Sequence, residues 1–371
     1  MRAAGSSRAS LAAASAVLLA GCANRPADVA APSTDPRGGA IVVSPDGTVV
    51  GQGRHMRAGD PHAEVVALND AGDRARGATL YVTLEPCRHH GRTGPCTTRI
   101  IDAGIARVVA AMADPNPLMR GKSFDDLHAR GIQVDVGQLA VAAARMNQAF
   151  LTVQTLGRPM VILKAATSLD ARISEAAGTR TSITSAAANR RTQMLRAACD
   201  AVAVGSGTVL ADDPLLTVRD CYRSRPLARV IFDRRLRTPA TARLFSTLEQ
   251  GPVIIVTANR HDAEHDQRVR HLARAGATVL PGVGELGADL EALIEHGISS
   301  VLLEGGAELQ AAAWQAGVVD RLHLVVAPRV LGAAGVKLFA GRPVPWGELQ
   351  PARVESLGPD AWMEADVYGH H

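Results

Sequence analysis

The sequence is poor in aromatic residues and in cysteine, and it lacks long runs of any one kind of side chain. Aromatic residues make up 3% of the 371 residues, and no block of five or more like charges occurs. Because no aromatic residues alternate with basic ones, the net charge of +4 marks no nucleic-acid-binding surface. Five cysteines are an odd and small number for this length, which argues against a disulfide framework.

What the sequence does contain is typical of a globular protein with two domains. Hydrophobic residues make up 47% and charged residues 20% of a chain that is too long for one ordinary core. A turn signal, Gly-Arg-Pro at 157–159, precedes a restart of the pattern of strands and helices. We therefore expect an N-terminal segment at 1–32, a first domain at 33–152 and a second domain at 153–371.

Strands and helices alternate along the first domain. Apolar residues at 40–43 and 48–50 flank Ser-Pro-Asp-Gly, a hairpin turn signal. Asp60 and Pro61 fit the N-cap and the first position of a helix that runs to about Ala71. Further strands are expected at 79–83 and 105–112, and further helices near 95, at 123–131 and at 138–150. This alternation predicts a layered α/β domain.

The second domain shows the same alternation with short apolar strands. We expect strands at 160–166, 201–205, 228–232, 252–257 and 300–303, and a final strand pair at 321–327 and 362–368. We expect helices at 185–198, 263–275, 286–296 and 307–316. The second domain is therefore also predicted to be α/β.

Three short motifs in the first domain carry histidine, glutamate and cysteine in the order of a zinc site. His-Ala-Glu at 62–64 opens a helix, Glu-Pro-Cys at 85–87 follows a strand, and Gly-Pro-Cys at 94–96 opens the next helix. One imidazole and two thiolates supply three zinc ligands and leave a fourth position open for water. Helix N-termini favour the deprotonated thiolates.

These residue types point to one kind of chemistry. The expected ligands are His62, Cys87 and Cys96, and zinc held by them lowers the pKa of its water towards ~7. Glu64, two residues after the histidine, is the expected catalytic residue, because it can relay the water proton to a ring nitrogen and then to the departing amine. The set predicts hydrolytic deamination of an aminated ring.

The spacing of the two cysteines narrows this prediction. Most zinc deaminases of bases and nucleosides place the second cysteine three residues after the first, whereas Cys96 follows nine residues after Cys87. With this insertion, with YVTLEPC at 81–87 and with Asp-Pro-Asn-Pro at 114–117, the chain resembles the bifunctional deaminase/reductase family of riboflavin biosynthesis. The resemblance implies a cytidine-deaminase-like α/β/α domain followed by a dihydrofolate-reductase-like α/β domain.

The resemblance also implies a two-step reaction. The first domain would use Zn²⁺ to deaminate 2,5-diamino-6-(5-phosphoribosylamino)pyrimidin-4-one, and the second would use NADPH to reduce the ribosyl side chain to ribityl. The expected partner is thus a small phosphorylated pyrimidine rather than nucleic acid, and a homo-oligomer is expected because multimers are usual in the family. The alternative is a diverged paralogue that acts on a related pyrimidine in a secondary, pyrimidotriazine-type pathway, with a weakened reductase domain.

Candidate substrate-binding residues lie close to the expected zinc site. His89 and Arg92 are good partners for the substrate phosphate, and the alternative is that they are solvated loop charges. Where the family usually has an asparagine that contacts the pyrimidine, this chain has Asp35, which can accept but not donate a hydrogen bond. Arg88 stands where a serine is usual.

Three blocks of the second domain resemble the reductase half of the family. They are KAATSLD at 164–170, GSGTVLADDPLLTVR at 205–219 and LEGGAEL at 303–309. The glycine turn at a helix N-terminus suits the phosphates of a cofactor. The residues expected at the substrate are Lys164, Arg180, Arg196, Leu216, Arg219 and Glu304. Those expected at NADPH are Ala166, Ser182, Thr208, Asp212, Arg234, Gly305 and Gly306.

The second domain also departs from the family pattern. The family commonly has Ser-Gln-Trp-Ile-Thr where this chain has Arg-Thr-Ser-Ile-Thr at 180–184, so Arg180 replaces a serine and Ser182 replaces a tryptophan. Losing the indole removes a stacking surface worth on the order of 1 kcal/mol. Arg234 either meets the extra phosphate of the cofactor or is a surface charge. These changes predict a weakened, altered or retuned reductase.

The N-terminal segment allows two interpretations. Arg2 and Arg8 precede an apolar run that ends in Leu-Ala-Gly-Cys at 19–22, which resembles a bacterial lipoprotein signal with Cys22 as the lipidated residue. The run is too short to span a bilayer as a helix. The alternative is a first, alanine-rich helix of a cytosolic domain. We expect a cytoplasmic enzyme, because the chemistry predicted downstream uses cytosolic metabolites, and leave anchoring through Cys22 as the alternative.

Overall fold

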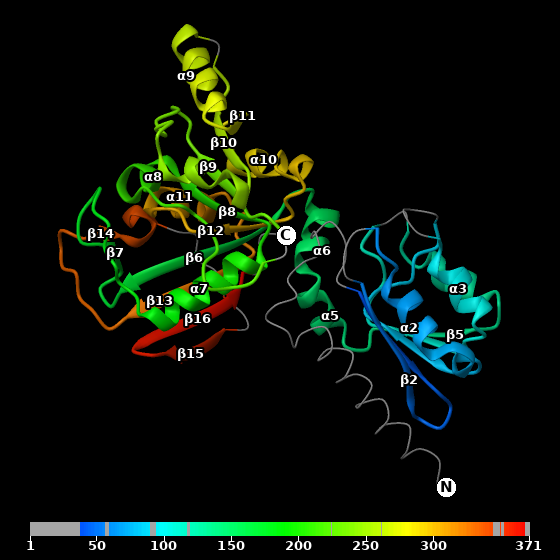
Figure 1. Ribbon diagram of the computed structural model, residues 1–371. Helices are drawn as coiled ribbons and strands as arrows, with labels where there is room; N and C mark the ends of the chain where they lie inside the picture. Colours follow the sequence, from blue (N-terminus) through cyan, green and yellow to red (C-terminus); the bar gives the residue numbers. More distant parts are fainter. Residues whose placement is uncertain are drawn as a thin grey trace. The chain divides into compact units, whose positions relative to one another are not determined.

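A computed structural model of the chain describes residues 38–55, 59–89, 94–116, 119–223, 225–260, 262–343, 349 and 352–367. Two compact units separate within these residues, one ending at Gly157 and the other beginning at Arg158 (Figure 1). The border expected at 152/153 falls inside the last helix of the first unit. Among the described residues, no helix has both the length and the apolar character that a membrane crossing requires. The lipoprotein-like segment and Cys22 lie outside the described residues.

The first unit is built on a five-stranded sheet. Its strands are β1 (Gly39–Val43), β2 (Val49–Arg54), β3 (Thr79–Val82), β4 (Arg107–Ala110) and β5 (Gln133–Val136). They lie in the order β2-β1-β3-β4-β5, with β1 antiparallel to β2 and β3, and with β3, β4 and β5 parallel. The predicted hairpin and both later strands are confirmed. β5 was not predicted, because its sequence, Gln-Val-Asp-Val, has too few apolar residues to stand out.

Six short helical segments of the described residues accompany this sheet. They are α2 (Ala63–Ala71), η1 (Gly72–Ala75), α3 (Cys96–Asp102), α4 (Lys122–His128), α5 (Ala140–Met146) and α6 (Gln148–Leu156). The prediction that a helix starts at Asp60 and Pro61 is wrong by two residues, because His62 has extended backbone (φ −65°, ψ 158°) and serves as the N-cap of α2. The helix predicted at 138–150 is two helices, because Asn147 leaves helical geometry between them.

Two glycines of β2 bring helix α2 unusually close to the sheet. A Cβ atom on Gly51 would lie 2.2 Å from the carbonyl oxygen of Ala67, and one on Gly53 would lie 2.0 Å from that of Ala63. Only glycine leaves room for backbone at these distances. The start of α2, which carries His62 and Glu64, is therefore held firmly against the sheet.

The second unit is built on a nine-stranded sheet in the order β11-β10-β9-β8-β12-β6-β13-β16-β15. The seven strands from β11 to β13 are parallel, and β16 is antiparallel to both its neighbours. The bounds are β6 (Met160–Ser168), β8 (Ala201–Gly205), β9 (Ala228–Phe232), β10 (Val253–Ala258), β11 (Ala277–Gly282), β12 (Ser300–Leu303), β13 (Arg321–Ala327), β15 (Arg353–Leu357) and β16 (Asp360–Asp366). A separate pair joins β7 (Arg172–Ser174) to β14 (Val336–Lys337).

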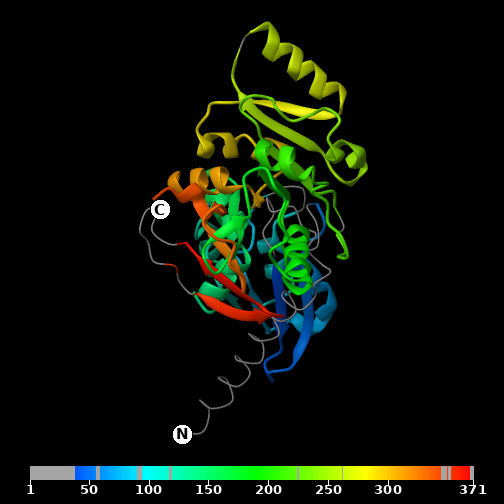
Figure 2. The same cartoon turned by 90° about the vertical axis from the view of Figure 1, so that its left-hand side faces the viewer.

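Helices connect the parallel strands of this unit. They are α7 (Ala186–Ala198), α8 (Ser206–Asp212), α9 (Ala263–Arg274), α10 (Leu286–Glu291) and α11 (Ala307–Gln315), with 3₁₀ turns η2 (Arg243–Gln250), η3 (Ile294–His296) and η4 (Leu338–Gly341). Helix α9 packs along β11, and the β15–β16 hairpin forms the opposite edge of the sheet (Figures 1 and 2). The predicted strands and helices of this domain are confirmed, except that the helix predicted at 286–296 is the shorter α10 followed by η3. The elements that were not predicted are β7, β11, β14, β15, α8, η2 and η4.

Candidate active sites

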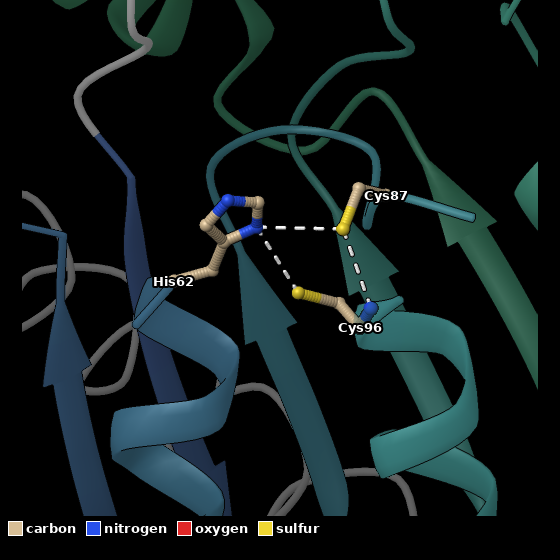
Figure 3. A group of neighbouring side chains, drawn as sticks. All are labelled: His62, Cys87 and Cys96. Carbon is tan, nitrogen blue, oxygen red and sulfur yellow. Dashed lines mark hydrogen bonds between the residues drawn. The ribbon is translucent and has the colours of Figure 1, made fainter. Parts of the chain in front are cut away.

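Three side chains from separate segments of the first unit converge on one point (Figure 3). His62 is the N-cap of α2, Cys96 is the first residue of α3, and Cys87 lies in the segment after β3. Nδ1 of His62 lies 3.2 Å from Sγ of Cys96 and 3.4 Å from Sγ of Cys87. The possible ligand atoms of all three lie within 4.8 Å of one another. This is the group expected from the sequence.

The surrounding backbone and ring contacts orient these donors. The N–H of Cys96 donates a hydrogen bond to Sγ of Cys87 at 3.3 Å. The ring of His55 packs edge-on against that of His62, with 5.4 Å between centroids, and Nδ1 of His55 lies 3.2 Å from the carbonyl oxygen of Pro61. Nδ1 is the ring nitrogen of His62 that lies close to both sulfur atoms.

The two thiols differ strongly in acidity. A hydrogen bond from Cys96 is the main reason that the pKa of Cys87 falls to about 4, and the same interaction raises the pKa of Cys96. A divalent cation between the two cysteines favours the thiolate form of both, so these donors fit zinc with three protein ligands and one open position.

Glu64 is placed beside this group but is not one of its three possible metal ligands. It is the second residue of α2, and its side chain is buried, which raises the pKa of its carboxyl group, while its own backbone N–H and the neighbouring His62 oppose the shift. A carboxyl group with a raised pKa is suited to take up and release a proton near neutral pH.

The other residues expected in the first site are described only in part. His89 is exposed in the segment after Cys87, and its charge acts on Asp114, whose pKa is raised mainly by burial. Asp35 and Arg92 lie outside the described residues. Arg88 forms an exposed ion pair with Asp126 at 3.1 Å.

A pocket of about 200 Å³ in the second unit gathers most of the residues expected there. Seven expected residues line it: Arg180, Arg196, Thr208, Asp212, Leu216, Arg219 and Glu304. Its wall also includes Val204, Asp213, Pro214, Leu215, Thr217 and Arg243. Arg243, from the start of η2, was not predicted, because no sequence pattern connects this turn with residues near 212.

A buried ion pair fixes one wall of this pocket. Arg196 donates from Nε to Glu304 Oε1 at 2.6 Å and from Nη2 to Oε2 at 2.9 Å, and its Nη1 donates to the carbonyl oxygen of Thr217 at 3.0 Å. Burial alone would raise the pKa of Glu304, but the charge and hydrogen bonds of Arg196, helped by Lys164, hold it below its ordinary value. The pair is therefore ionised, and it connects α7, β12 and the loop after α8.

Lys164 lies within electrostatic reach of this pair. Its side chain is on β6, where burial lowers its pKa, the charge of Arg196 acts in the same direction, and Glu304 opposes them. The glycine turn is where the sequence placed it, since Gly306 is the N-cap of α11 and donates from its N–H to Oγ1 of Thr208 at 3.2 Å.

Five residues expected at the cofactor are not part of the pocket wall: Gly305 and Gly306 of the glycine turn, and Ala166, Ser182 and Arg234. Ala166 packs against the core cluster that contains Trp362. Ser182 is exposed, and its carbonyl oxygen accepts a hydrogen bond from Nη1 of Arg329 at 3.0 Å. Arg234 is exposed immediately after Asp233, beyond the end of β9.

The two units together define a class of enzyme, a zinc-type deaminase domain followed by a reductase domain. Residues 18–112 match the family model of the cytidine and deoxycytidylate deaminase zinc-binding region, and residues 159–363 match that of the RibD C-terminal domain. The chain belongs to the RibD family of riboflavin biosynthesis proteins. It is a bifunctional deaminase and reductase, with the expected cytidine-deaminase-like and dihydrofolate-reductase-like fold classes and with a zinc-binding deaminase domain.

Relatives of known name resemble the chain over most of its length. It is 42% identical over 299 residues to the riboflavin biosynthesis protein RibD of Aquifex aeolicus, covering 80% of this chain and 82% of that protein. It is 40% identical over 344 residues to RibD of Escherichia coli, covering 89% and 92%. The solved structure of Acinetobacter baumannii RibD has a TM-score of 0.85 at 35% identity, covering 98% of this chain and 99% of that one.

A second solved structure carries a more detailed name. The Thermotoga maritima protein, described as a diaminohydroxyphosphoribosylaminopyrimidine deaminase/5-amino-6-(5-phosphoribosylamino)uracil reductase, has a TM-score of 0.77 at 32% identity. The match covers 90% of this chain and 93% of that one.

Proposed function

We propose that the first domain deaminates 2,5-diamino-6-(5-phosphoribosylamino)pyrimidin-4-one, and that the second reduces the ribosyl side chain of the product to ribityl with NADPH. The observation that carries this proposal is the convergence of His62, Cys87 and Cys96 beside Glu64. The name of the Thermotoga maritima structure supports the choice of pyrimidine.

In the deaminase domain, His62, Cys87 and Cys96 would hold the metal through Nδ1 and the two sulfur atoms. When bound, zinc supplies a nucleophilic hydroxide at neutral pH. The Glu64 carboxylate takes the proton of the attacking water on one oxygen. It delivers that proton to the ring nitrogen next to the reacting carbon and then carries the proton of the newly added hydroxyl group to the amine. The carbon–nitrogen bond breaks as the ring carbonyl forms, and the amine leaves as ammonia.

In the reductase domain, the pocket residues act mainly by positioning. Hydride transfer to a sugar carbon requires cofactor and substrate to be held in contact, rather than a nucleophile. The ion pair of Arg196 and Glu304 keeps one wall rigid, which leaves Arg180 and Arg219 to offer positive charge to the substrate phosphate. Thr208 and the glycine turn face the cofactor, and Lys164, with its lowered pKa, assists opening of the sugar ring.

The test is incubation of the full-length protein with the diaminopyrimidine phosphate, with and without NADPH, followed by mass spectrometry of the products. The proposal expects replacement of one amine by oxygen without NADPH, and addition of two further hydrogens with it. Absence of the first change at full zinc occupancy contradicts the proposed substrate.

One observation favours a second candidate, the diverged paralogue of a secondary pathway with a weakened reductase. Arg180, which replaces a serine, lines the pocket within electrostatic reach of Asp212. A larger, charged side chain at this place changes which substrate fits. Failure to rescue a riboflavin auxotroph, by a protein that retains zinc, favours this candidate, whereas rescue excludes it.

We also propose that the enzyme is cytoplasmic and forms a homo-oligomer. Recovery of the full-length chain in the cytosolic fraction supports the first part, and labelled lipid on Cys22 contradicts it. Sedimentation of the purified protein tests the second part.

A further inference from the structure

Glu85 makes an unusual set of contacts close to the zinc ligands. It lies between β3 and Cys87, and it is only 6% exposed. Its Oε2 accepts hydrogen bonds from the N–H groups of Asp114 at 3.0 Å and Gly121 at 2.9 Å. Its Oε1 accepts from the N–H of Ser123 at 3.1 Å and from the Ser123 hydroxyl at 2.8 Å. Each oxygen of this buried carboxylate therefore accepts two hydrogen bonds.

All four donors belong to one segment, which runs from the end of β4 into α4. Strands β3 and β4 are parallel neighbours, so the residues after each of them meet at the same edge of the sheet. Within the segment, Oδ1 of Asp114 accepts from the N–H of Asn116 at 2.8 Å. Asp114 also lies within electrostatic reach of His89, two residues beyond Cys87. The segment therefore stands beside the loop that carries a metal ligand.

We propose that Glu85 is a positioning residue of the deaminase, whose carboxylate fixes Asp114, Gly121 and Ser123 as one wall of the zinc site. The proposal rests on the proposed deamination, because the wall is the surface against which the pyrimidine is held. Glu85 touches neither metal nor substrate, and it acts through the segment. A wall held by four hydrogen bonds is rigid before substrate arrives, which reduces the ordering that binding requires.

Only a carboxylate can make this set of contacts. A glutamine has one acceptor oxygen, and its NH₂ group is a donor. In Glu85→Gln, the NH₂ group faces either the two N–H groups of Asp114 and Gly121 or the N–H of Ser123. In both orientations a buried N–H group loses its acceptor, although the side chain keeps its shape.

The experiment uses zinc-loaded, full-length Glu85→Gln with the diaminopyrimidine phosphate. We expect the KM of deamination to rise on the order of 10-fold, with a smaller change in kcat, because the wall is loosened while the catalytic groups remain. Zinc content and the reductase rate should match the wild type. Amide hydrogen exchange in the peptide from Asp114 to Ser123 should be faster, a readout that does not depend on activity.

Two further variants keep the test decisive. Ser123→Ala removes one donor and leaves three, so it should raise KM and exchange to a smaller extent. Val108→Ala weakens the buried core of β4 without touching Glu85, and it should lower thermal stability with KM unchanged. If Glu85→Gln does not fold, Ser123→Ala decides the question.

Unchanged KM and unchanged exchange in the folded variants overturn the proposal, and so does an equal loss of deaminase and reductase activity. If the proposed deamination itself is wrong, the experiment gives a different result. In that case the wild type does not deaminate the pyrimidine at all, while zinc content and exchange still report on Glu85.

Discussion

Removal of one partner from the ion pair between Arg196 and Glu304 should destabilise the second domain severely. The side chains are 13% and 12% exposed, and two short hydrogen bonds join them. In Arg196→Met, the Glu304 carboxylate remains buried, with Lys164 as the nearby cation that still lowers its pKa. Breaking a buried pair in this way costs about 3–5 kcal/mol, most of it from the charge left without its partner.

Tryptophan fluorescence in a urea titration can measure this loss for the second domain alone. All three tryptophans of the chain, Trp314, Trp346 and Trp362, follow Arg158 in the sequence. Arg268→Met is the matched control, because its ion pair with Glu264 is exposed and spans one helical turn. That control should cost less than about 0.5 kcal/mol.

The double variant Arg196→Met/Glu304→Gln tests the stated cause. Because it leaves no unpaired carboxylate, its cost should be at least about 1 kcal/mol below the sum of the two single variants. A cost for Arg196→Met close to that of the Arg268 control would refute the reasoning, and so would strict additivity in the double variant.

Three other changes have equally definite expected results. Glu64→Gln should retain zinc but slow ammonia release by about 100-fold or more, because the proton carrier is lost. Metal analysis and an ammonia assay measure the two results. Loss of the metal would instead show that Glu64 is a ligand. Gly51→Ala places a Cβ 2.2 Å from the carbonyl oxygen of Ala67, so α2 must shift; zinc affinity and deamination should fall while reduction is retained, and unchanged zinc affinity would contradict this. Burial lowers the pKa of His323 from 6.5 to about 4, so the unfolded chain takes up this proton first as the pH falls. The free energy of unfolding of the second domain should therefore fall by up to about 3 kcal/mol as the pH is lowered from 6.5 to 4. In His323→Gln the fall should be smaller, as measured by urea titrations at each pH.

Much of the zinc site was predictable from local sequence. His62 and Cys96 lie at the starts of helices, and Cys87 follows a strand, so ordinary secondary-structure signals place them where ligands of this kind occur. The glycine turn before α11 was predictable for the same reason, because a helix N-terminus is recognised from a few adjacent residues. Errors of one or two residues in helix starts, as at Asp60, do not disturb such predictions.

Contacts between distant segments were not predictable in this way. Arg196 and Glu304 were both expected at the substrate, but their bidentate pairing across 108 residues follows from the order of strands in the sheet. Arg243 reaches the pocket only because η2 folds back beside the loop after α8, where its N–H donates to Asp213.

Sequence alone predicted the family, the metal ligands and Glu64, because each of these predictions depends on residue types at short spacing. The tertiary structure was needed to show which charged side chains pair with one another, as Arg196 and Glu304 do, and which line the pocket. Glu85 is the clearest case, since it belongs to a recognisable motif while its four hydrogen-bond donors lie 29 to 38 residues away. The pairing of parallel strands β3 and β4 brings acceptor and donors together, and no local pattern encodes that pairing.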